Sequence, residues 1–306
     1  MKTVKLGSVG LHVPAVAVGC MRIGELSDEA LDKHLSLCRD YGLYFFDHAD
    51  IYGGGECEKK FAASVRRIGL RREKMILQSK CGIVPGKMYD QSRDYILKSV
   101  DGILARLKTE YLDILLLHRP DALMEPDEVA SAFNALHASG KVRHFGVSNF
   151  RPGQIELLKK SVSQPILTNQ LQFGVAFSGM IASGIEANME TAGAVERDGG
   201  VLDYCRLHDI TVQAWSPFQY GFFQGTFLGS DKYPELNAVL GELAEKYEVT
   251  PAAIATAWIL RHPAEMQMVA GTTNEEHLTE IIEGGDITLT REEWYKIYLS
   301  AGHILP

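Results

Sequence analysis

The chain has 306 residues, of which 46% are hydrophobic and 23% are charged, and this is the composition of an ordinary globular protein. Its formal net charge of −8 at pH 7 argues against a general nucleic-acid partner or an acidic membrane surface, because neutralising phosphates requires clustered Lys and Arg. The arginines of residues 66–72 form a compact basic cluster, which we interpret as a solvated helix end.

The cysteines and the hydropathy of the chain predict its compartment. The five cysteines are widely spaced and include no CxxC pair, so neither a disulfide framework nor a zinc ribbon is predicted. No window approaches the roughly 20 apolar residues of a membrane-spanning helix. We therefore expect a soluble, cytoplasmic protein and leave its oligomeric state open.

Apolar, β-branched runs of strand length recur eight times. They span residues 13–18, 44–47, 75–79, 112–118, 144–148, 166–170, 210–216 and 266–270. Stretches with helical spacing lie between most of them, including residues 28–39, 93–107, 127–138 and 154–160. Because eight βα units in a chain of 306 residues match a closed barrel better than an open sheet, we predict an α/β fold, a (β/α)8 TIM barrel forming one domain over residues 1–306. The opening KTVKLGSVGLHV predicts a β-hairpin at the barrel floor.

A barrel of this kind carries its active site where the strands end at their carboxyl side. The stretch LYFFDHADIY passes abruptly from apolar to ionisable residues and places Asp47 and Tyr52 at one strand mouth. The next two strands lead to Lys80 and His118. Each residue alone has a plainer interpretation, as a surface lysine, a structural histidine or a loop tyrosine. Their conjunction at one rim predicts a reactive site.

The chemistry expected of these four residues follows from charge. A buried aspartate is costly unless a cation pairs with it, so we expect Lys80 to pair with Asp47. The positive charge of Lys80 should also lower the pKa of Tyr52 toward the working range of a general acid. His118 could then donate to the same substrate oxygen. The following strands end in further polar or aromatic residues, namely Ser148, Asn149, Asn169, Gln170, Trp215 and Ser216.

This set of residues resembles the active site of the aldo-keto reductases. The Asp, Tyr, Lys and His tetrad of that family is matched by Asp47, Tyr52, Lys80 and His118. The segments FDHADIYGGGE, YLDILLLHRPD, GKVRHFGVSNF, TNQLQ, AWSPF, AWILRHP and GTTNEEHL are similar to family motifs and span nearly the whole chain. SKCGI, HRPD and GKVRHFGVSNF look most like the bacterial subgroup called YdhF-like. The resemblance implies reduction of an aldehyde or ketone to an alcohol by a nicotinamide cofactor, normally NADPH and less often NADH. The lack of a GxGxxG fingerprint agrees with a cofactor bound without a Rossmann domain.

The same resemblance assigns the cofactor site. It implies that Ser148, Asn149 and Gln170 hold the carboxamide and that Trp215 stacks on the nicotinamide. The pyrophosphate loop would begin at Ser216, Pro217 and Phe218. Residues implied at the adenosine end are Gly271, Thr272, Thr273, Asn274, His277 and Glu280, and Met21 and Arg22 complete the set.

Three positions depart from the family pattern. Arg119 stands where much of the family has a tryptophan that shapes the substrate pocket, to which we also assign Phe222 and Phe223. Trp215 replaces a commoner tyrosine. Asn274 and His277 stand where many NADPH-preferring members place Lys and Arg, so we expect a weaker preference for NADPH that grows as pH falls and imidazole gains charge.

Two segments between predicted elements are unusually long. Residues 173–200 and 218–233 exceed the length of an ordinary βα loop. We expect residues 173–200 to close over cofactor or substrate, with a packed insertion as the alternative.

Two other functions are alternatives to carbonyl reduction. A metal-dependent hydrolase using His12, His48, Asp50 and His118 is disfavoured because no HxH pair closes a strand. A reductase-shaped NADPH-binding regulatory protein with little turnover is the other reading.

Overall fold

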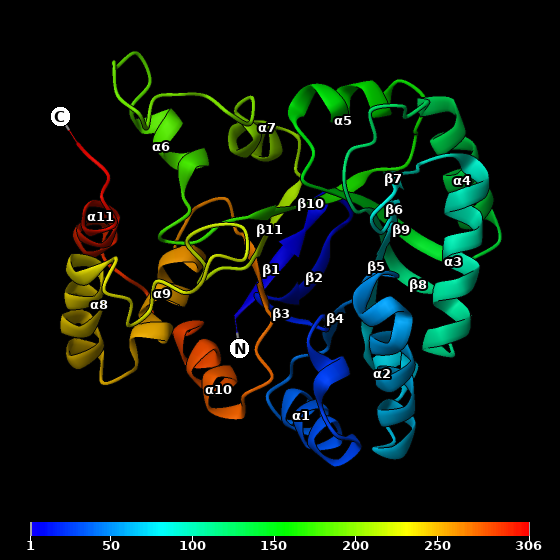
Figure 1. Ribbon diagram of the computed structural model, residues 1–306, viewed down its shortest axis with the longest axis horizontal. Coiled ribbons are helices and arrows are strands. Elements are labelled where there is room, and N and C mark those ends of the chain that lie inside the picture. The colour runs from blue at the N-terminus through cyan, green and yellow to red at the C-terminus, as the bar shows by residue number, and fades with distance from the viewer. Residues whose placement is uncertain (1, 306) are drawn as a thin grey trace.

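The centre of the computed structural model, which describes residues 2–305, is a closed barrel of eight parallel strands (Figure 1). In order around the barrel the strands are β3 (Val16–Gly19), β4 (Phe45–Asp47), β5 (Ile76–Cys81), β8 (Leu112–Leu117), β9 (Val142–Ser148), β10 (Ile166–Gln172), β11 (Thr211–Trp215) and β12 (Gln267–Ala270). Parallel strands covered on both faces need apolar residues on both, and every residue of β8, with the sequence LDILLL, is buried. The predicted barrel is confirmed.

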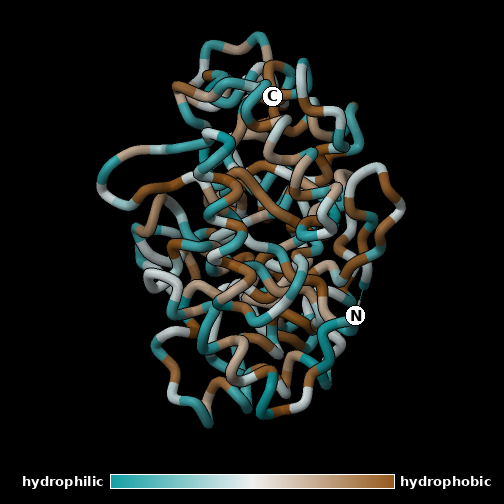
Figure 2. Tube along the Cα trace, turned by 90° about the vertical axis from the view of Figure 1, so that its right-hand side faces the viewer, coloured by the Kyte–Doolittle hydropathy of each residue, from teal (hydrophilic) through white to brown (hydrophobic). Residues whose placement is uncertain are grey.

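Helices surround the barrel (Figure 1). They are α1 (Asp28–Asp40), α2 (Glu56–Arg67), α3 (Arg93–Leu107), α4 (Pro126–Ala138), α5 (Pro152–Lys159), α6 (Gly179–Ile185), α7 (Val201–Leu207), α8 (Pro234–Tyr247), α9 (Pro251–Leu260), α10 (Glu275–Gly284) and α11 (Arg291–Ser300). Short 3-10 turns occupy Gly7–Val9, Ile23–Glu25, Tyr52–Gly55 and Arg72–Lys74. In Figure 2 apolar stretches run through the middle of the trace and hydrophilic stretches gather in the outer loops. None of the helices within residues 2–305 is long and apolar enough to cross a membrane.

An antiparallel hairpin closes the floor of the barrel, as predicted. It consists of β1 (Thr3–Leu6) and β2 (Leu11–Pro14). The backbone N–H of Gly7 donates to Oγ1 of Thr211 at 2.8 Å, and Thr211 is the first residue of β11. Gly7 has a φ of +60°, and a Cβ there would come within 2.8 Å of the backbone of Leu167, so only glycine fits this turn. The carboxyl ends of the strands are therefore left as the open rim.

The segment of residues 173–200 contradicts the prediction that it closes over cofactor or substrate, because none of its residues lines the rim cavity. Ile181 is buried, and Oγ of Ser178 lies 2.7 Å from Nε2 of His303. The ring of His303 stacks on Tyr298 of α11 with centroids 4.2 Å apart. The start of the segment is a packed insertion, because Phe173, Val175 and Ile181 join the core and Ser178 bonds to the C-terminal segment, beside which α6 lies in Figure 1.

Candidate active site

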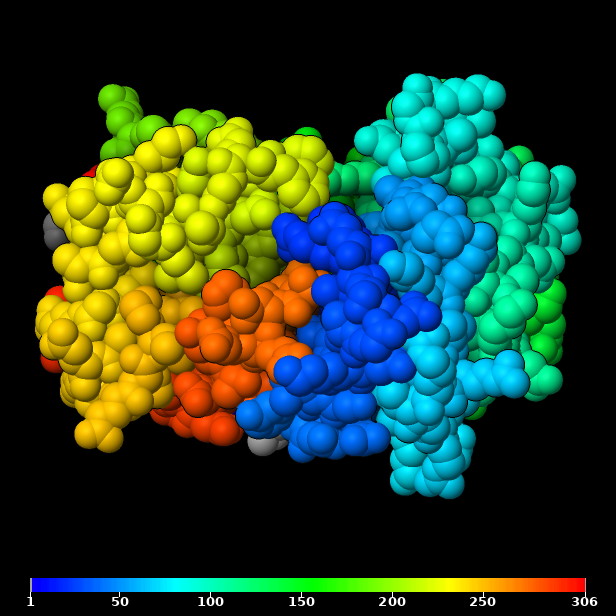
Figure 3. All heavy atoms as spheres, turned by 60° about the horizontal axis from the view of Figure 1, so that its bottom comes forward, coloured from blue at the N-terminus to red at the C-terminus, as the bar shows by residue number. Residues whose placement is uncertain are grey.

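A cavity of about 1270 Å³ opens at the carboxyl ends of the barrel strands. The loops after β3, β11 and β12, coloured blue, yellow and orange, meet on this face of the molecule (Figure 3). The cavity brings together every predicted cofactor and pocket residue, namely Met21, Arg22, Ser148, Asn149, Gln170, Trp215, Ser216, Pro217, Phe218, Gly271, Thr272, Thr273, Asn274, His277, Glu280, Arg119, Phe222 and Phe223. Asn169 is outside it, because its amide donates to the carbonyl of Phe150 at 2.8 Å instead.

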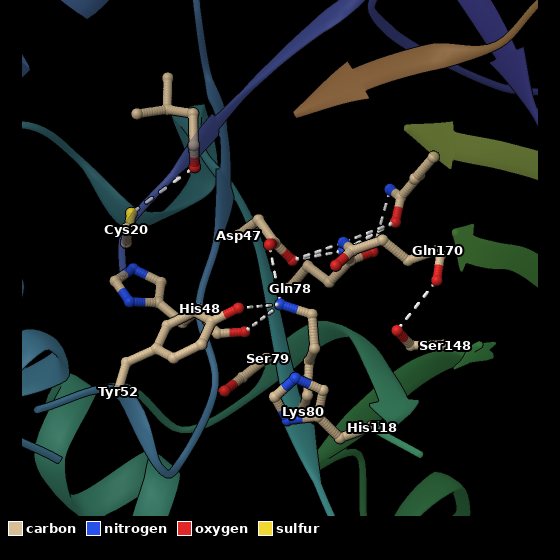
Figure 4. A network of polar contacts seen from close by, with 12 residues as sticks. Cys20, Asp47, His48, Tyr52, Gln78, Ser79, Lys80, His118, Ser148 and Gln170 are labelled. Atoms are coloured by element: carbon tan, nitrogen blue, oxygen red, sulfur yellow. Dashed lines mark hydrogen bonds and ion pairs between the residues drawn. The ribbon is translucent and has the colours of Figure 1, made fainter. Parts of the chain in front are cut away.

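The four predicted catalytic side chains lie together at one side of this cavity (Figure 4). Nζ of Lys80 donates to Oδ2 of Asp47 at 2.7 Å, to the carbonyl of His48 at 2.9 Å and to Oη of Tyr52 at 3.1 Å. Asp47, Tyr52 and His118 line the cavity, whereas Lys80 is completely buried behind them. Lys80 can therefore act on a bound molecule only through Asp47 and Tyr52.

Burial and charge compete over the protonation of the lysine and the phenol. Burial disfavours the charge of Lys80, but Asp47 and Tyr52 outweigh it and raise the pKa of Lys80 above its ordinary value. Burial also raises the pKa of Tyr52, and the charge of Lys80 offsets only part of that rise. The prediction that the pKa of Tyr52 is lowered is thus wrong for the net shift. The phenol keeps its proton at neutral pH, which is the form that a general acid requires.

His118 is held in its neutral form. Burial, followed by the charges of Lys80 and Arg119, lowers the pKa of His118 well below its ordinary value. Its ring stands edge-on to that of Tyr52, with centroids 6.0 Å apart and planes at 81°. Within residues 2–305, no group is hydrogen-bonded to its buried Nδ1. A neutral imidazole beside the phenol can donate one hydrogen bond without carrying charge.

A row of buried glutamines inside the barrel holds Asp47, and the sequence analysis missed it. Oδ1 of Asp47 accepts from Nε2 of Gln78 at 2.6 Å and from Nε2 of Gln170 at 3.1 Å. Gln213 bonds to both of these glutamines and donates to Gln267 at 2.7 Å. Glutamine within a buried strand, as in ILQSKC and QMVA, was the available signal. Nε2 of Gln170 is already engaged, so its Oε1 is the atom left for a carboxamide.

Hydrogen bonds between neighbouring strand ends fix the predicted nicotinamide-facing residues. Nδ2 of Asn149 donates to Oγ of Ser148 at 2.7 Å and to the carbonyl of His118 at 3.3 Å. Nε1 of Trp215 donates to Oδ1 of Asn149 at 3.1 Å. Asn149 has a φ of +62°, a left-handed conformation that Asn tolerates better than most residues. The indole of Trp215 is thereby held at the cavity wall.

The far end of the cavity is built around the start of α10. Asn274 caps this helix by accepting from the backbone N–H of His277 at 3.1 Å. Nη1 of Arg22 donates to the carbonyl of Gly271 at 2.9 Å and so links the loops after β3 and β12. Lys33 of α1 pairs with Glu275 at 2.8 Å, a cation that the sequence analysis missed because its helix lies far away in the chain. The start of α10 offers backbone donors suited to an anion.

No group of three or more His, Cys, Asp or Glu side chains in residues 2–305 is arranged to hold a metal ion. Burial lowers the pKa of His48 to about 3, and its imidazole packs edge-on against Phe61 with ring centroids 4.6 Å apart. His48, which the hydrolase reading required as a ligand, is therefore a core histidine in this structure.

Comparison with known proteins agrees with this geometry. The model of the aldo/keto reductase family matches residues 15–298. The chain belongs to the aldo/keto reductase family. It is 34% identical to the uncharacterized oxidoreductase YcsN of Bacillus subtilis, over 97% of each chain. It is also 34% identical to the oxidoreductase YdhF of Escherichia coli, over 90% of this chain and 88% of that one. The predicted family, and with it an oxidoreductase, is confirmed.

Among solved structures, the chain is similar to an aldo/keto reductase from Klebsiella pneumoniae in complex with NADP and acetate. The two are 27% identical and superpose with a TM-score of 0.77, covering 97% of this chain and 94% of that chain. The cavity of this family member fits a dinucleotide, since one continuous space reaches from Tyr52 past Trp215 to the start of α10. A Cβ on Gly19 would lie 3.2 Å from the side chain of Val269. Glycine at this position therefore lets the end of β3 lie close to the end of β12 at the cavity wall.

The loop of residues 218–233 covers this reductase's cavity in place of the 173–200 insertion. Phe218, Phe222 and Phe223 line it, although Phe222 is 61% exposed and Phe223 is 52% exposed. Nδ2 of Asn237 in α8 donates to the carbonyl of Phe227 at 2.9 Å and to that of Tyr233 at 2.8 Å. This anchor could not be predicted from the sequence, because an asparagine in a helix carries no sign of which loop lies above it.

Proposed function

We propose that this protein reduces an aldehyde or ketone to an alcohol with NADPH, and that Tyr52 is the general acid. The observation that carries the proposal is the position of Nζ of Lys80, which is bonded both to Asp47 at 2.7 Å and to Tyr52 at 3.1 Å beside neutral His118. Few arrangements other than proton transfer to a carbonyl oxygen use a protonated phenol, an ammonium and a neutral imidazole together.

Each residue has a distinct task in the reduction. When bound, the nicotinamide supplies a hydride to the carbonyl carbon. Tyr52 gives its proton to the carbonyl oxygen, so the hydride and the proton together make the alcohol. Lys80 donates to Oη of Tyr52 and stabilises the phenolate that is left, while Asp47 keeps Lys80 charged. His118 orients the carbonyl oxygen without competing for its proton, and solvent later returns a proton to Tyr52.

Two observations support NADPH as the cofactor. The solved structure of the Klebsiella pneumoniae relative contains NADP. In this chain, Asn149, Ser148 and Trp215 form a bonded wall next to Tyr52, and residues 271–274 place the start of α10 at the other end of the same cavity. These residues would hold the carboxamide and the phosphates, respectively.

The test is consumption of NADPH by the purified protein with a panel of aldehydes, ketones and quinones. Tyr52→Phe should reduce turnover by about 10²- to 10⁴-fold while leaving the Kd for NADPH unchanged. Turnover near that of the wild type in Tyr52→Phe would overturn the role of the tyrosine. Tight NADPH binding with no consumption on any member of the panel would favour the regulatory alternative instead.

A further inference from the structure

Arg119 lies in the wall of the cavity and is a cation without a protein partner among residues 2–305. It follows His118 at the end of β8 and is half-buried. The hydrogen bonds and ion pairs of residues 2–305 include none from its guanidinium group. Other half-buried arginines are satisfied: Arg72 pairs with Asp113 at 2.6 Å, and Arg106 pairs with Glu58 at 2.6 Å. The guanidinium of Arg119 is therefore available to a ligand.

The surroundings of Arg119 make an unpaired charge costly. Its guanidinium carbon lies 5.9 Å from the ring centroid of Trp215 and 5.9 Å from that of Phe222. These distances are at the outer limit of a useful cation–π contact, so the rings compensate little for lost water. Burial accordingly lowers the pKa of Arg119, against a smaller opposing effect from Tyr89. An anion bound here would recover the lost solvation.

The other charges of the cavity do not meet this need. Asp47 is already paired with Lys80 at 2.7 Å. Arg22 is bonded to Gly271, and Glu280 lies on α10 at the opposite end of the cavity. Arg119 is thus the free cation on the His118 side among the residues described. His118 and Arg119 both line this cavity, so one small molecule can reach both side chains.

We propose that Arg119 binds a carboxylate of the substrate, so that this reductase prefers aldehydes or ketones that carry a carboxylate a few carbons from the carbonyl. The inference rests on the proposed carbonyl reduction and names its substrate class. A guanidinium matches a carboxylate with two parallel hydrogen bonds, which gives geometry as well as charge. Trp215 and Phe222 would contact the apolar body between the two polar ends.

The experiment compares matched pairs of substrates that differ only in charge. Succinic semialdehyde is paired with its methyl ester, and terephthalaldehydic acid is paired with its methyl ester. We expect wild-type kcat/KM to favour each acid by about 10- to 150-fold, the range of a hydrogen bond to a charged group. Arg119→Gln should abolish that preference, because it should lower kcat/KM for the acids more than for the esters, mainly through KM of the acids. Arg119→Lys should keep part of the preference, because it retains charge but not the planar fork.

The outcomes separate this inference from the proposed function. Equal kcat/KM for acids and esters in the wild type would overturn the carboxylate site and leave carbonyl reduction standing. Equal losses on acids and esters in Arg119→Gln would also overturn it, since Arg119 would then only support the aromatic wall. If no carbonyl is reduced, calorimetry with benzoate in the presence of NADP still tests the carboxylate site. A Kd for benzoate that Arg119→Gln raises at least about tenfold supports the site, and an unchanged Kd refutes it.

Discussion

Nζ of Lys80 lies 2.7 Å from Oδ2 of Asp47, and both side chains are almost completely buried. Neither charge has access to water that could replace its partner. Two glutamine amides also donate to Asp47, and Lys80 also donates to the carbonyl of His48. The pair is therefore part of a bonded core beneath the phenol of Tyr52, so we expect the stability of the protein and the proposed chemistry to depend on the same contact.

Lys80→Met should lower the free energy of unfolding by about 3–5 kcal/mol, because it leaves Asp47 as an uncompensated buried charge, and it should abolish turnover. Urea unfolding and NADPH consumption measure the two effects. Adding Asp47→Asn to this variant should restore much of the stability and none of the activity. A Lys80→Met variant as stable as the wild type would show that the ion pair does not stabilise the fold.

His277→Gln should weaken the preference for NADPH over NADH, because His277 lines the cavity at the start of α10 and can donate to the 2′-phosphate, while Glu275 is already paired with Lys33. The ratio of the Kd values for NADH and NADPH, measured in the wild type and in the variant, gives the size of the effect. A ratio that His277→Gln leaves unchanged would remove His277 from the site.

Asp50 should make the protein less stable as pH rises. Burial, followed by the charge of Glu58, raises the pKa of Asp50 to about 7, above the ordinary value of the unfolded chain. The folded state then binds the proton more tightly, so the stability from this group is present in acid and is lost as pH rises toward 7. The slope from one such group is at most about 1.4 kcal/mol per pH unit.

Asp50→Asn isolates this effect, since every other titrating group stays in place. Urea unfolding at a series of pH values should show the variant gaining stability relative to the wild type between about pH 4 and 7. A constant difference between the two proteins across that range would mean that Asp50 ionises at its ordinary pKa in the folded state.

NADPH should protect the loop of residues 218–233 from chymotrypsin and leave the 173–200 insertion unaffected. Phe222 and Phe223 line the cavity, whereas Phe177, which is 41% exposed, does not. At 100 times Kd only about 1% of the protein is free of cofactor, so cleavage at Phe222 and Phe223 should slow by up to about 100-fold. Mass spectrometry of the fragments locates each cut. Protection at Phe177 alone would reverse the roles of the two segments.

The sequence by itself determined the barrel and the rim at which Asp47, Tyr52, Lys80 and His118 meet. Apolar runs of strand length such as LDILLL favour strands buried on both faces, and eight of them alternating with helices leave a closed parallel barrel as the consistent arrangement. Parallel closure brings all carboxyl ends to one rim, so residues that follow the runs, including Tyr52 and His118, were predictable neighbours before any distance was known.

Only the tertiary structure decided which side chains meet across the barrel and in which direction their pKa values shift. The bond between Gln78 and Gln213 joins residues 135 positions apart, and it depends on register and closure rather than on local periodicity. The pKa of Tyr52 is a balance between burial and the nearby charge of Lys80, so its direction required both quantities. The path of residues 173–200 depends in the same way on the segments that pack beside it. So does the lack of a partner for Arg119 among the residues described. A contact is a property of two segments, whereas a sequence pattern describes only one of them.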